Sequence, residues 1–259
     1  MRYLYVDLLR ICRSRRCFLG IGGVFFTLLF AHVDNKGSLE SVLFMSQYIL
    51  DGIPFFMCMI FSILTYSDSL CEDVRSKYYR LEIVRGSTKK YCVSRILSIF
   101  FSAFFSMMLG YLFFVVFLKL QFPWKMPQDS VFDGLVRSGA FRAVLQSEHY
   151  LFYYILVSIQ LGILAGVLAL FSACISLKIR NRMLIYTIPV VFFYFLTNAT
   201  YRLPQKMQYL ELYKIYIPSY NVWNNDLLSF LWALAIGILG TLCFGSCIFH
   251  QIKGALENE

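Results

Sequence analysis

The segment Tyr150–Leu177, "YLFYYILVSIQLGILAGVLALFSACISL", is an apolar run of 28 residues without a charged side chain. An α-helix needs about 20 mainly apolar residues to cross the hydrocarbon core of a bilayer, so this run is long enough to do so. The whole chain is 59% hydrophobic, 18% aromatic and only 15% charged, with a mean hydropathy of +0.63. Ordinary globular domains carry about 25% charged residues. This composition excludes a soluble fold and predicts an integral membrane protein.

Five further apolar runs have about the length of a membrane span. No series of ten-residue segments with alternating hydrophobicity occurs, which argues against an outer-membrane barrel. The predicted fold is therefore all-α, an integral membrane bundle of six transmembrane helices in one domain over residues 1–259. The five further runs are Cys17–Val33, Ser46–Ser67, Ile96–Leu118, Met183–Tyr201 and Leu227–Phe249.

The basic stretch before the first run, "RICRSRRC", is similar to the start of a secretory signal peptide. A signal peptide is followed by a small-residue cleavage site of the A-x-A kind, and the sequence "AHVDNKGSLE" is a poor match to it. The first run is therefore predicted to remain as a membrane helix.

The distribution of Lys and Arg predicts the orientation of the bundle. With six spans both termini share one side, which carries sixteen basic residues, mostly in the segments 1–16, 68–95 and 178–182. The other side carries eight, mostly in the loops 119–149 and 201–226. Both termini are therefore predicted to be cytoplasmic, with an amphipathic cytoplasmic segment at 1–16. The net charge of +9 follows the same rule and favours contact with anionic headgroups over nucleic acid.

The eight cysteines agree with this orientation, because all fall in predicted helices or on the predicted cytoplasmic side. None lies in a predicted outer loop, where an oxidising space would pair them. No C-x-x-C pair occurs, so the interpretation is apolar packing rather than a metal site. The cysteines are Cys12, Cys17, Cys58, Cys71, Cys92, Cys174, Cys243 and Cys247.

The sequence lacks the motifs of common catalytic sites. The stretch "RGSTKK" at Arg85–Lys90 lacks the first glycine and the Lys-Ser/Thr order of a phosphate-binding loop. Neither H-E-x-x-H nor G-x-S-x-G occurs, and His32, His149 and His250 stand far apart in the sequence. We therefore predict no catalytic residue, cofactor or metal in this chain.

Several residues within the predicted spans have two interpretations each. Asp51 either lies at the interface or caps a half-helix, or it belongs to a transport path, because intramembrane acids tend to be functional. Pro54 and Pro189 either mark moving helices or form static kinks. Stripes of small residues indicate packing within the bundle or, alternatively, a dimer seam. The stripes are Gly162, Ala165, Gly166, Ala169 and Ala173, followed by Ala233, Gly237, Thr241 and Gly245.

The segment Glu72–Tyr91 places nine charged residues in twenty positions between the second and third spans. Its pattern predicts a short surface helix over Val74–Arg85, a turn at Gly86 and a cap at Ser87 for the next helix. Apolar residues interleaved with the charges favour contact with lipid or protein over a fully solvated loop. These are Tyr78, Tyr79, Leu81, Ile83 and Val84.

Three features together resemble the ABC-2-type transporter permease family. They are the amphipathic start "YLYVDLLRICRSRRCF", the layout of six helices in about 260 residues, and the pattern Arg-Gly-Ser-x-Lys-Lys-Tyr-x-x-Ser-Arg that ends at Arg95. The layout covers the full length, whereas the specific motif covers Glu72–Arg95. Many family members have proline where this chain has Gly86.

The resemblance implies the membrane subunit of an ATP-driven exporter in a bacterial plasma membrane. In that family the loop 68–95 forms a coupling helix that docks on a separate ATPase subunit, which binds ATP and Mg. Two permease chains, identical or related, then pair around a central path. The implied docking residues are Glu72, Arg75, Tyr78, Tyr79, Arg80, Glu82, Arg85 and Gly86.

By the same family layout, the second and fifth helices line the path of an amphipathic or apolar cargo such as a peptide, lipid or drug, and the loop 201–226 forms short helices above it. The implied path residues are Asp51, Phe55, Phe56, Met59, Tyr186, Phe193 and Asn198. The alternative function is a non-transport membrane protein that gives immunity to a peptide or senses it. A membrane-embedded enzyme is disfavoured by the missing catalytic motifs.

Overall fold

The computed structural model describes residues 2–34, 41–76, 87–126, 130–179, 181–201 and 209–257, and in these ranges it contains helices and no strand. Five described helices are long and apolar enough to cross a membrane, and a bent helix pair supplies a sixth candidate. The all-helical membrane fold is thus confirmed. The helices are α1 Arg2–Arg13, α2 Arg15–Asp34, α3 Val42–Leu50, α4 Ile53–Ile63, α5 Ser69–Arg75, α7 Thr88–Gln121, α8 Ser130–Ser138, α9 Arg142–Gln146, α10 Tyr150–Ser176, α11 Arg182–Tyr201, α12 Leu212–Tyr216 and α13 Asp226–Glu257.

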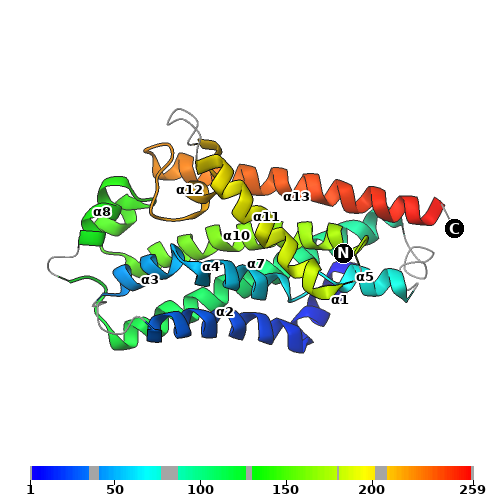
Figure 1. Cartoon of the computed structure of the whole chain (residues 1–259), viewed down its shortest axis with the longest axis horizontal. Helices are drawn as coiled ribbons and strands as arrows, with labels where there is room; N and C mark the ends of the chain where they lie inside the picture. Colours follow the sequence, from blue (N-terminus) through cyan, green and yellow to red (C-terminus); the bar gives the residue numbers. More distant parts are fainter. Residues whose placement is uncertain are drawn as a thin grey trace.

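The long helices run side by side in one elongated bundle, with α1, α5 and the end of α13 at one end and α8 and α12 at the other (Figure 1). Helix α10 packs against α7, α13, α11 and α4 and lies at the centre. Of its most apolar window, 72% is buried, against 17% for α13. A large apolar area of the outer helices therefore remains for lipid or a partner.

The predicted second span, Ser46–Ser67, is not one straight helix. It consists of α3 and α4, which meet at 74° across Asp51 and Gly52. Pro54 lies in the first turn of α4, where its missing N–H costs no helical hydrogen bond, so the predicted kink inside a helix is wrong for Pro54. Pro189 does lie inside α11, as predicted. Asp51 is the exposed C-cap residue of α3 and accepts a hydrogen bond from the Tyr213 hydroxyl at 3.1 Å.

Small residues let the central helices approach closely. A Cβ added to Gly162 would lie 2.9 Å from the Phe104 ring, and one added to Gly166 would lie 2.6 Å from the Phe100 ring. On α13, a Cβ at Gly237 would lie 2.4 Å from Ile163 of α10. The predicted stripes therefore serve packing between α7, α10 and α13 within one chain.

Helix α7 begins where the sequence predicts a cap. The Ser87 hydroxyl accepts a hydrogen bond from the Lys90 backbone N–H at 3.3 Å. With 34 residues the helix is about 51 Å long, well beyond a hydrocarbon core of about 30 Å. Its first turns lie at the end of the bundle that holds α1 and α5, because Arg95 pairs with Asp7 of α1 and Asp73 of α5.

At the opposite end, α12 enters the bundle from the predicted outer loop 201–226. Ile215 and Tyr216 are buried, and the Tyr216 hydroxyl donates to the Ala233 carbonyl at 3.2 Å. The Gln160 amide donates to the Ile215 carbonyl from the buried face of α10. Helix α12 of this loop therefore packs between the ends of α10 and α13.

Candidate functional site

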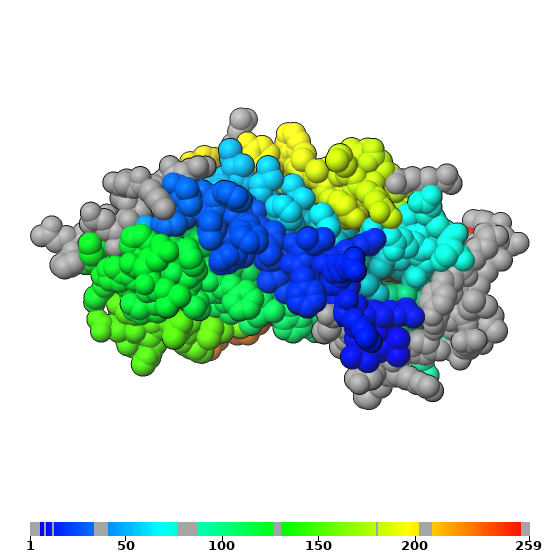
Figure 2. Space-filling view, turned by 90° about the horizontal axis from the view of Figure 1, so that it is seen from below, coloured from blue at the N-terminus to red at the C-terminus, as the bar shows by residue number. Residues whose placement is uncertain are grey.

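Charged side chains from five parts of the chain meet at the end of the bundle that holds α1 and α5. Figure 2 shows the molecule from below, with α1 in dark blue and the α5 region in cyan toward one end and the green part of the chain toward the other. We call these residues the charge cluster. It consists of Asp7 of α1, Arg16 of α2, Asp68, Glu72 and Asp73 around α5, Arg95 of α7 and Arg182 of α11.

Arg95 is the centre of one half of the charge cluster. Its guanidinium lies 3.1 Å from a carboxylate oxygen of Asp7 and 2.5 Å from one of Asp73, and its side chain is only 3% exposed. It also donates to the Tyr66 hydroxyl at 2.5 Å, and its Cζ atom lies 5.6 Å from the centre of the Tyr91 ring. Arg95 thus joins α1, α5 and the segment that follows α4.

Hydroxyl groups complete the coordination of the two carboxylates. Ser94 donates to Asp7 at 2.8 Å, and the Tyr91 hydroxyl donates to Asp73 at 2.8 Å. Burial raises the pKa of the Asp73 carboxyl, while Arg95 and the Tyr91 hydroxyl oppose that rise by favouring the ionised form. Asp7, Asp73 and Arg95 are therefore buried charges that are paired and hydrogen-bonded. A buried charge needs such partners to offset its loss of hydration.

The other half of the charge cluster connects α5 to α2 and α11. Asp68 and Glu72 are four residues apart, a spacing that places both on one face of a helical segment. Arg16 donates to Asp68 at 2.8 Å and to Glu72 at 2.9 Å. Arg182 donates to Glu72 at 3.0 Å, and its Nε atom lies 3.7 Å from Asp68. The start of α5 is therefore held by two arginines from two different spans.

Of the eight predicted docking residues, the structure describes two. Glu72 is engaged within the chain by Arg16 and Arg182, while Arg75 at the end of α5 is exposed. The remaining six lie outside the described residues, as does most of the helix predicted over Val74–Arg85. These six are Tyr78, Tyr79, Arg80, Glu82, Arg85 and Gly86.

The structure brings three of the seven predicted path residues together. Phe193 of α11 lies 6.4 Å from Phe55 and 6.3 Å from Phe56 of α4, measured between ring centres. The Tyr194 ring lies 5.5 Å from the Phe56 ring. We call Phe55, Phe56, Phe193 and Tyr194 the aromatic cluster. It forms the contact between the two helices that carry Pro54 and Pro189.

The other four predicted path residues lie elsewhere. Met59 is fully buried in α4, and Asn198 is exposed and donates to the Tyr194 carbonyl of its own helix at 2.9 Å. Asp51 lies at the α12 end, whereas Tyr186 lies at the opposite end and interacts with Asp68. Tyr186 therefore belongs with the charge cluster rather than with the aromatic cluster.

Sequence reasoning missed the pairing of Asp7 with Arg95. A signal was present, because Asp7 is the one acid in a basic amphipathic helix and Arg95 directly precedes an apolar run. An arginine beside a membrane span is usually stabilised either by an acidic partner or by the polar headgroup region of the bilayer. The sequence could have suggested that each needs a partner, but 88 positions separate them and no local pattern connects them.

Within the described residues no group of three or more His, Cys, Asp or Glu side chains is placed to hold a metal ion. Cys58, Cys71, Cys92, Cys174, Cys243 and Cys247 carry free thiols. No protein-family model matches the chain, and neither a curated protein nor a solved structure matches it significantly. A function for this chain is therefore inferred from the chemistry and geometry of its residues.

We expect Tyr91→Phe to lower the free energy of unfolding by about 1.5 to 3 kcal/mol, the usual contribution of a hydrogen bond to a charged group. The substitution removes the hydroxyl that donates to Asp73 and keeps the ring beside Arg95. Thermal unfolding of the purified protein in detergent measures the change. Tyr48→Phe, at an exposed position of α3, is the control. Equal unfolding temperatures for the two variants would contradict the importance of this hydrogen bond.

Proposed function

We propose that this chain is the membrane-spanning subunit of an ATP-binding cassette transporter and that a separate ATPase subunit docks on its loop 68–95. The observation that carries the proposal is the charge cluster at the start of this loop. A force applied to the loop reaches α1 and α7 through Arg95, and α2 and α11 through Arg16 and Arg182. These contacts support the proposal because a partner that moved the loop would act on four helices at once.

The connection to α11 gives the force a route to the middle of the bundle. Arg182 and Tyr186 occupy the first turns of α11, beside Asp68 and Glu72. Two turns further along, Phe193 of the same helix packs on Phe55 and Phe56 of α4. Movement at the base of α11 shifts the groups along the helix, and Pro189, between Tyr186 and Phe193, is the point where the helix can bend as in a hinge motion. The aromatic cluster is therefore the proposed place where the cargo path opens.

The proposal assigns separate tasks to separate chains. The sequence contains no phosphate-binding loop, so ATP and Mg are assigned to the partner ATPase. A second permease chain, identical or related, is proposed to complete the path, and the exposed apolar faces of α11 and α13 are available for it or for lipid. The proposal puts the termini and the loop 68–95 in the cytoplasm, an orientation that the distribution of Lys and Arg supports, and its cargo is amphipathic or apolar.

Charge reversal in the docking loop tests the function. We expect Arg80→Glu and Arg85→Glu to lower both co-purification with the proposed partner ATPase and transport by about tenfold, a loss of about 1.4 kcal/mol of binding free energy. Arg137→Glu is the control, because Arg137 is exposed on α8 at the other end of the bundle.

Two results would contradict the transporter proposal. One is transport that is unaffected by both loop variants, together with a chain that neither co-purifies with the ATPase nor stimulates it. The other is protection of the host from a peptide that persists when the ATPase is inactivated, which would favour the immunity or sensor function instead.

A further inference from the structure

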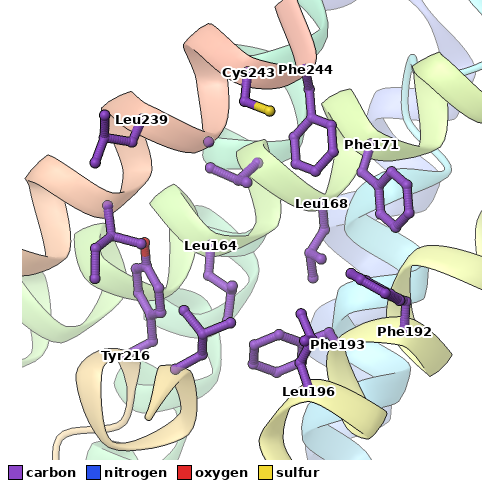
Figure 3. Close-up of a pocket in the computed structure, with 14 residues that line it drawn as sticks. Leu164, Leu168, Phe171, Phe192, Phe193, Leu196, Tyr216, Leu239, Cys243 and Phe244 are labelled. Atoms are coloured by element: carbon purple, nitrogen blue, oxygen red, sulfur yellow. The ribbon is translucent and has the colours of Figure 1, made fainter. Parts of the chain in front are cut away.

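A cavity of about 380 Å³ lies between α11 and α13, with α10 as its floor and α12 at one end. Figure 3 shows the side chains of all four helices around it, including Leu164 and Leu168 of α10, Leu196 of α11, Tyr216 of α12 and Leu239 of α13. Its volume is within the range of about 300 to 1,000 Å³ that is usual for ligand sites.

Side chains line the cavity at both of its ends. At one end the Phe171 ring lies 5.3 Å from the Phe192 ring and 4.9 Å from the Phe244 ring, measured between ring centres. At the other end Leu212 and Tyr216 of α12 contribute to the wall. From Ile236 to Phe244 the wall spans nine residues of α13, which are about 12 Å apart from first to last along the helix. The cavity is thus a slot with a defined length along the bundle.

The chemistry of the wall selects an apolar ligand. Among the described residues that line the slot, the polar side-chain groups are the Tyr216 hydroxyl and the Cys243 thiol. The hydroxyl already donates to the Ala233 carbonyl at 3.2 Å. A charged or strongly polar headgroup inside the slot would lose its hydration without compensation, at a cost of several kcal/mol.

The slot opens sideways, toward the region that surrounds a membrane protein. Phe192 on α11 and Leu239 on α13 line it and are 47% and 64% exposed. Both helices are long and apolar enough to span a bilayer, so a ligand enters between them from lipid rather than from water. The nearest source of an apolar chain is a membrane phospholipid whose headgroup stays at the interface.

The size of the slot decides between a lipid chain and a helix from a second copy of this protein. A helix that spans a bilayer needs about 20 residues, or about 30 Å, and is about 10 Å across with its side chains. The slot follows only about 12 Å of α13 and is bounded by aromatic rings at one end and by α12 at the other, so it does not admit such a helix along its length. A single hydrocarbon chain is thinner and flexible, so a stretch of it can enter the slot from the side.

We propose that the slot between α11 and α13 binds one acyl chain of a membrane phospholipid. The inference is independent of transport activity. It does place the lipid beside the proposed path, because Phe193 lines the slot and also packs on Phe55 and Phe56. A bound acyl chain therefore contacts the helix through which the charge cluster is connected to the aromatic cluster.

Two measurements on the full chain test the proposal. In bilayer nanodiscs that contain phosphatidylcholine with a diazirine at the end of one acyl chain, irradiation should label Phe192–Leu196 and Leu239–Phe244 more strongly than the exposed face of α2. Native mass spectrometry after extraction in mild detergent should find one retained phospholipid per chain.

A matched pair of substitutions on α13 distinguishes the slot from the general lipid surface. Leu239 and Leu242 are each 64% exposed, but only Leu239 lines the slot. Leu239→Trp should lower retained phospholipid and slot labelling about tenfold, equivalent to about 1.4 kcal/mol, whereas Leu242→Trp should leave both near the wild-type values. If Leu239→Trp does not fold, Leu196→Trp fills the slot from α11 and carries the same expectation.

Three results would overturn the proposal. The first is slot labelling no stronger than that of α2, and the second is an equal loss in Leu239→Trp and Leu242→Trp. The third is retention of a free fatty acid without a headgroup, which would identify a different ligand.

Discussion

Arg95→Met is expected to lower the free energy of unfolding by about 3 to 5 kcal/mol, because it leaves the carboxylates of Asp7 and Asp73 buried without their shared cation. This is a large fraction of the stability of a typical domain, which is about 5 to 15 kcal/mol. Methionine keeps most of the side-chain volume, so the lost charge rather than a cavity dominates the effect. The readout is the thermal unfolding temperature of the detergent-solubilised protein.

The control uses an arginine from the other half of the charge cluster. Arg182 pairs with Glu72 at 3.0 Å, and the two side chains are 59% and 46% exposed. Asp68 is buried but keeps its ion pair with Arg16 at 2.8 Å when Arg182 is replaced. Exposed pairs contribute about 0 to 1 kcal/mol, so Arg182→Met should change stability little. Comparable losses in the two variants would contradict the assignment of Arg95 as the buried centre.

Neutralising the two acids should rescue the Arg95→Met variant. A triple variant that also carries Asp7→Asn and Asp73→Asn has no buried charge at this site, and removing a whole buried set often costs little. We expect it to recover at least half of the lost stability. A triple variant less stable than Arg95→Met would show that packing rather than charge explains the loss.

The same variant should show a changed pH dependence. Burial already raises the pKa of Asp73, and loss of Arg95 removes the strongest of the groups that oppose this rise. A carboxyl whose pKa is raised on folding binds a proton more readily when folded, so it favours the folded state at low pH. Arg95→Met should therefore be most stable at acidic pH and lose stability as the pH rises through the raised pKa. A stability deficit that is the same at all pH values would contradict this explanation.

The spans of the bundle could be predicted from sequence because hydropathy is a local property. The predicted run Tyr150–Leu177 coincides with α10 within one residue, and Met183–Tyr201 coincides with α11 to the same degree. The break between α3 and α4 also had a local signal, since Asp51, Gly52 and Pro54 follow one another within four positions. The prediction of one span there gave more weight to the apolar flanks than to these helix-breaking residues.

The charge cluster could not be predicted in the same way, because its partners are far apart in the sequence. Asp7 and Arg95 meet only because α1 folds back beside the first turns of α7. Their pairing depends on the rotation of both helices, and hydropathy does not encode that rotation. The family layout assigned Phe55 and Phe193 to one cargo path but did not predict that their rings pack on each other, because that contact also depends on how α4 and α11 are rotated.

Gly110→Leu is expected to destabilise the protein by about 3 kcal/mol, at the upper end of the usual cost of overpacking. Gly110 lies where α7 crosses α2, and an added Cβ would lie 2.6 Å from the Cβ of Val24 and 3.0 Å from the Ile21 carbonyl oxygen. These neighbours are close to or part of the α2 backbone, so relief requires a shift of the helix rather than a new rotamer.

Gly22→Leu is the matched control for Gly110→Leu, because Gly22 lies in the same helix pair and an added Cβ would meet no atom within 4 Å. Both substitutions remove a glycine from an apolar helix and add the same side chain, so their common effects on helix propensity cancel in the comparison. Thermal unfolding should therefore give a much lower midpoint for Gly110→Leu than for Gly22→Leu. Similar midpoints would mean that α2 and α7 can separate at little cost, and the contact would then be a movable one rather than a fixed part of the bundle.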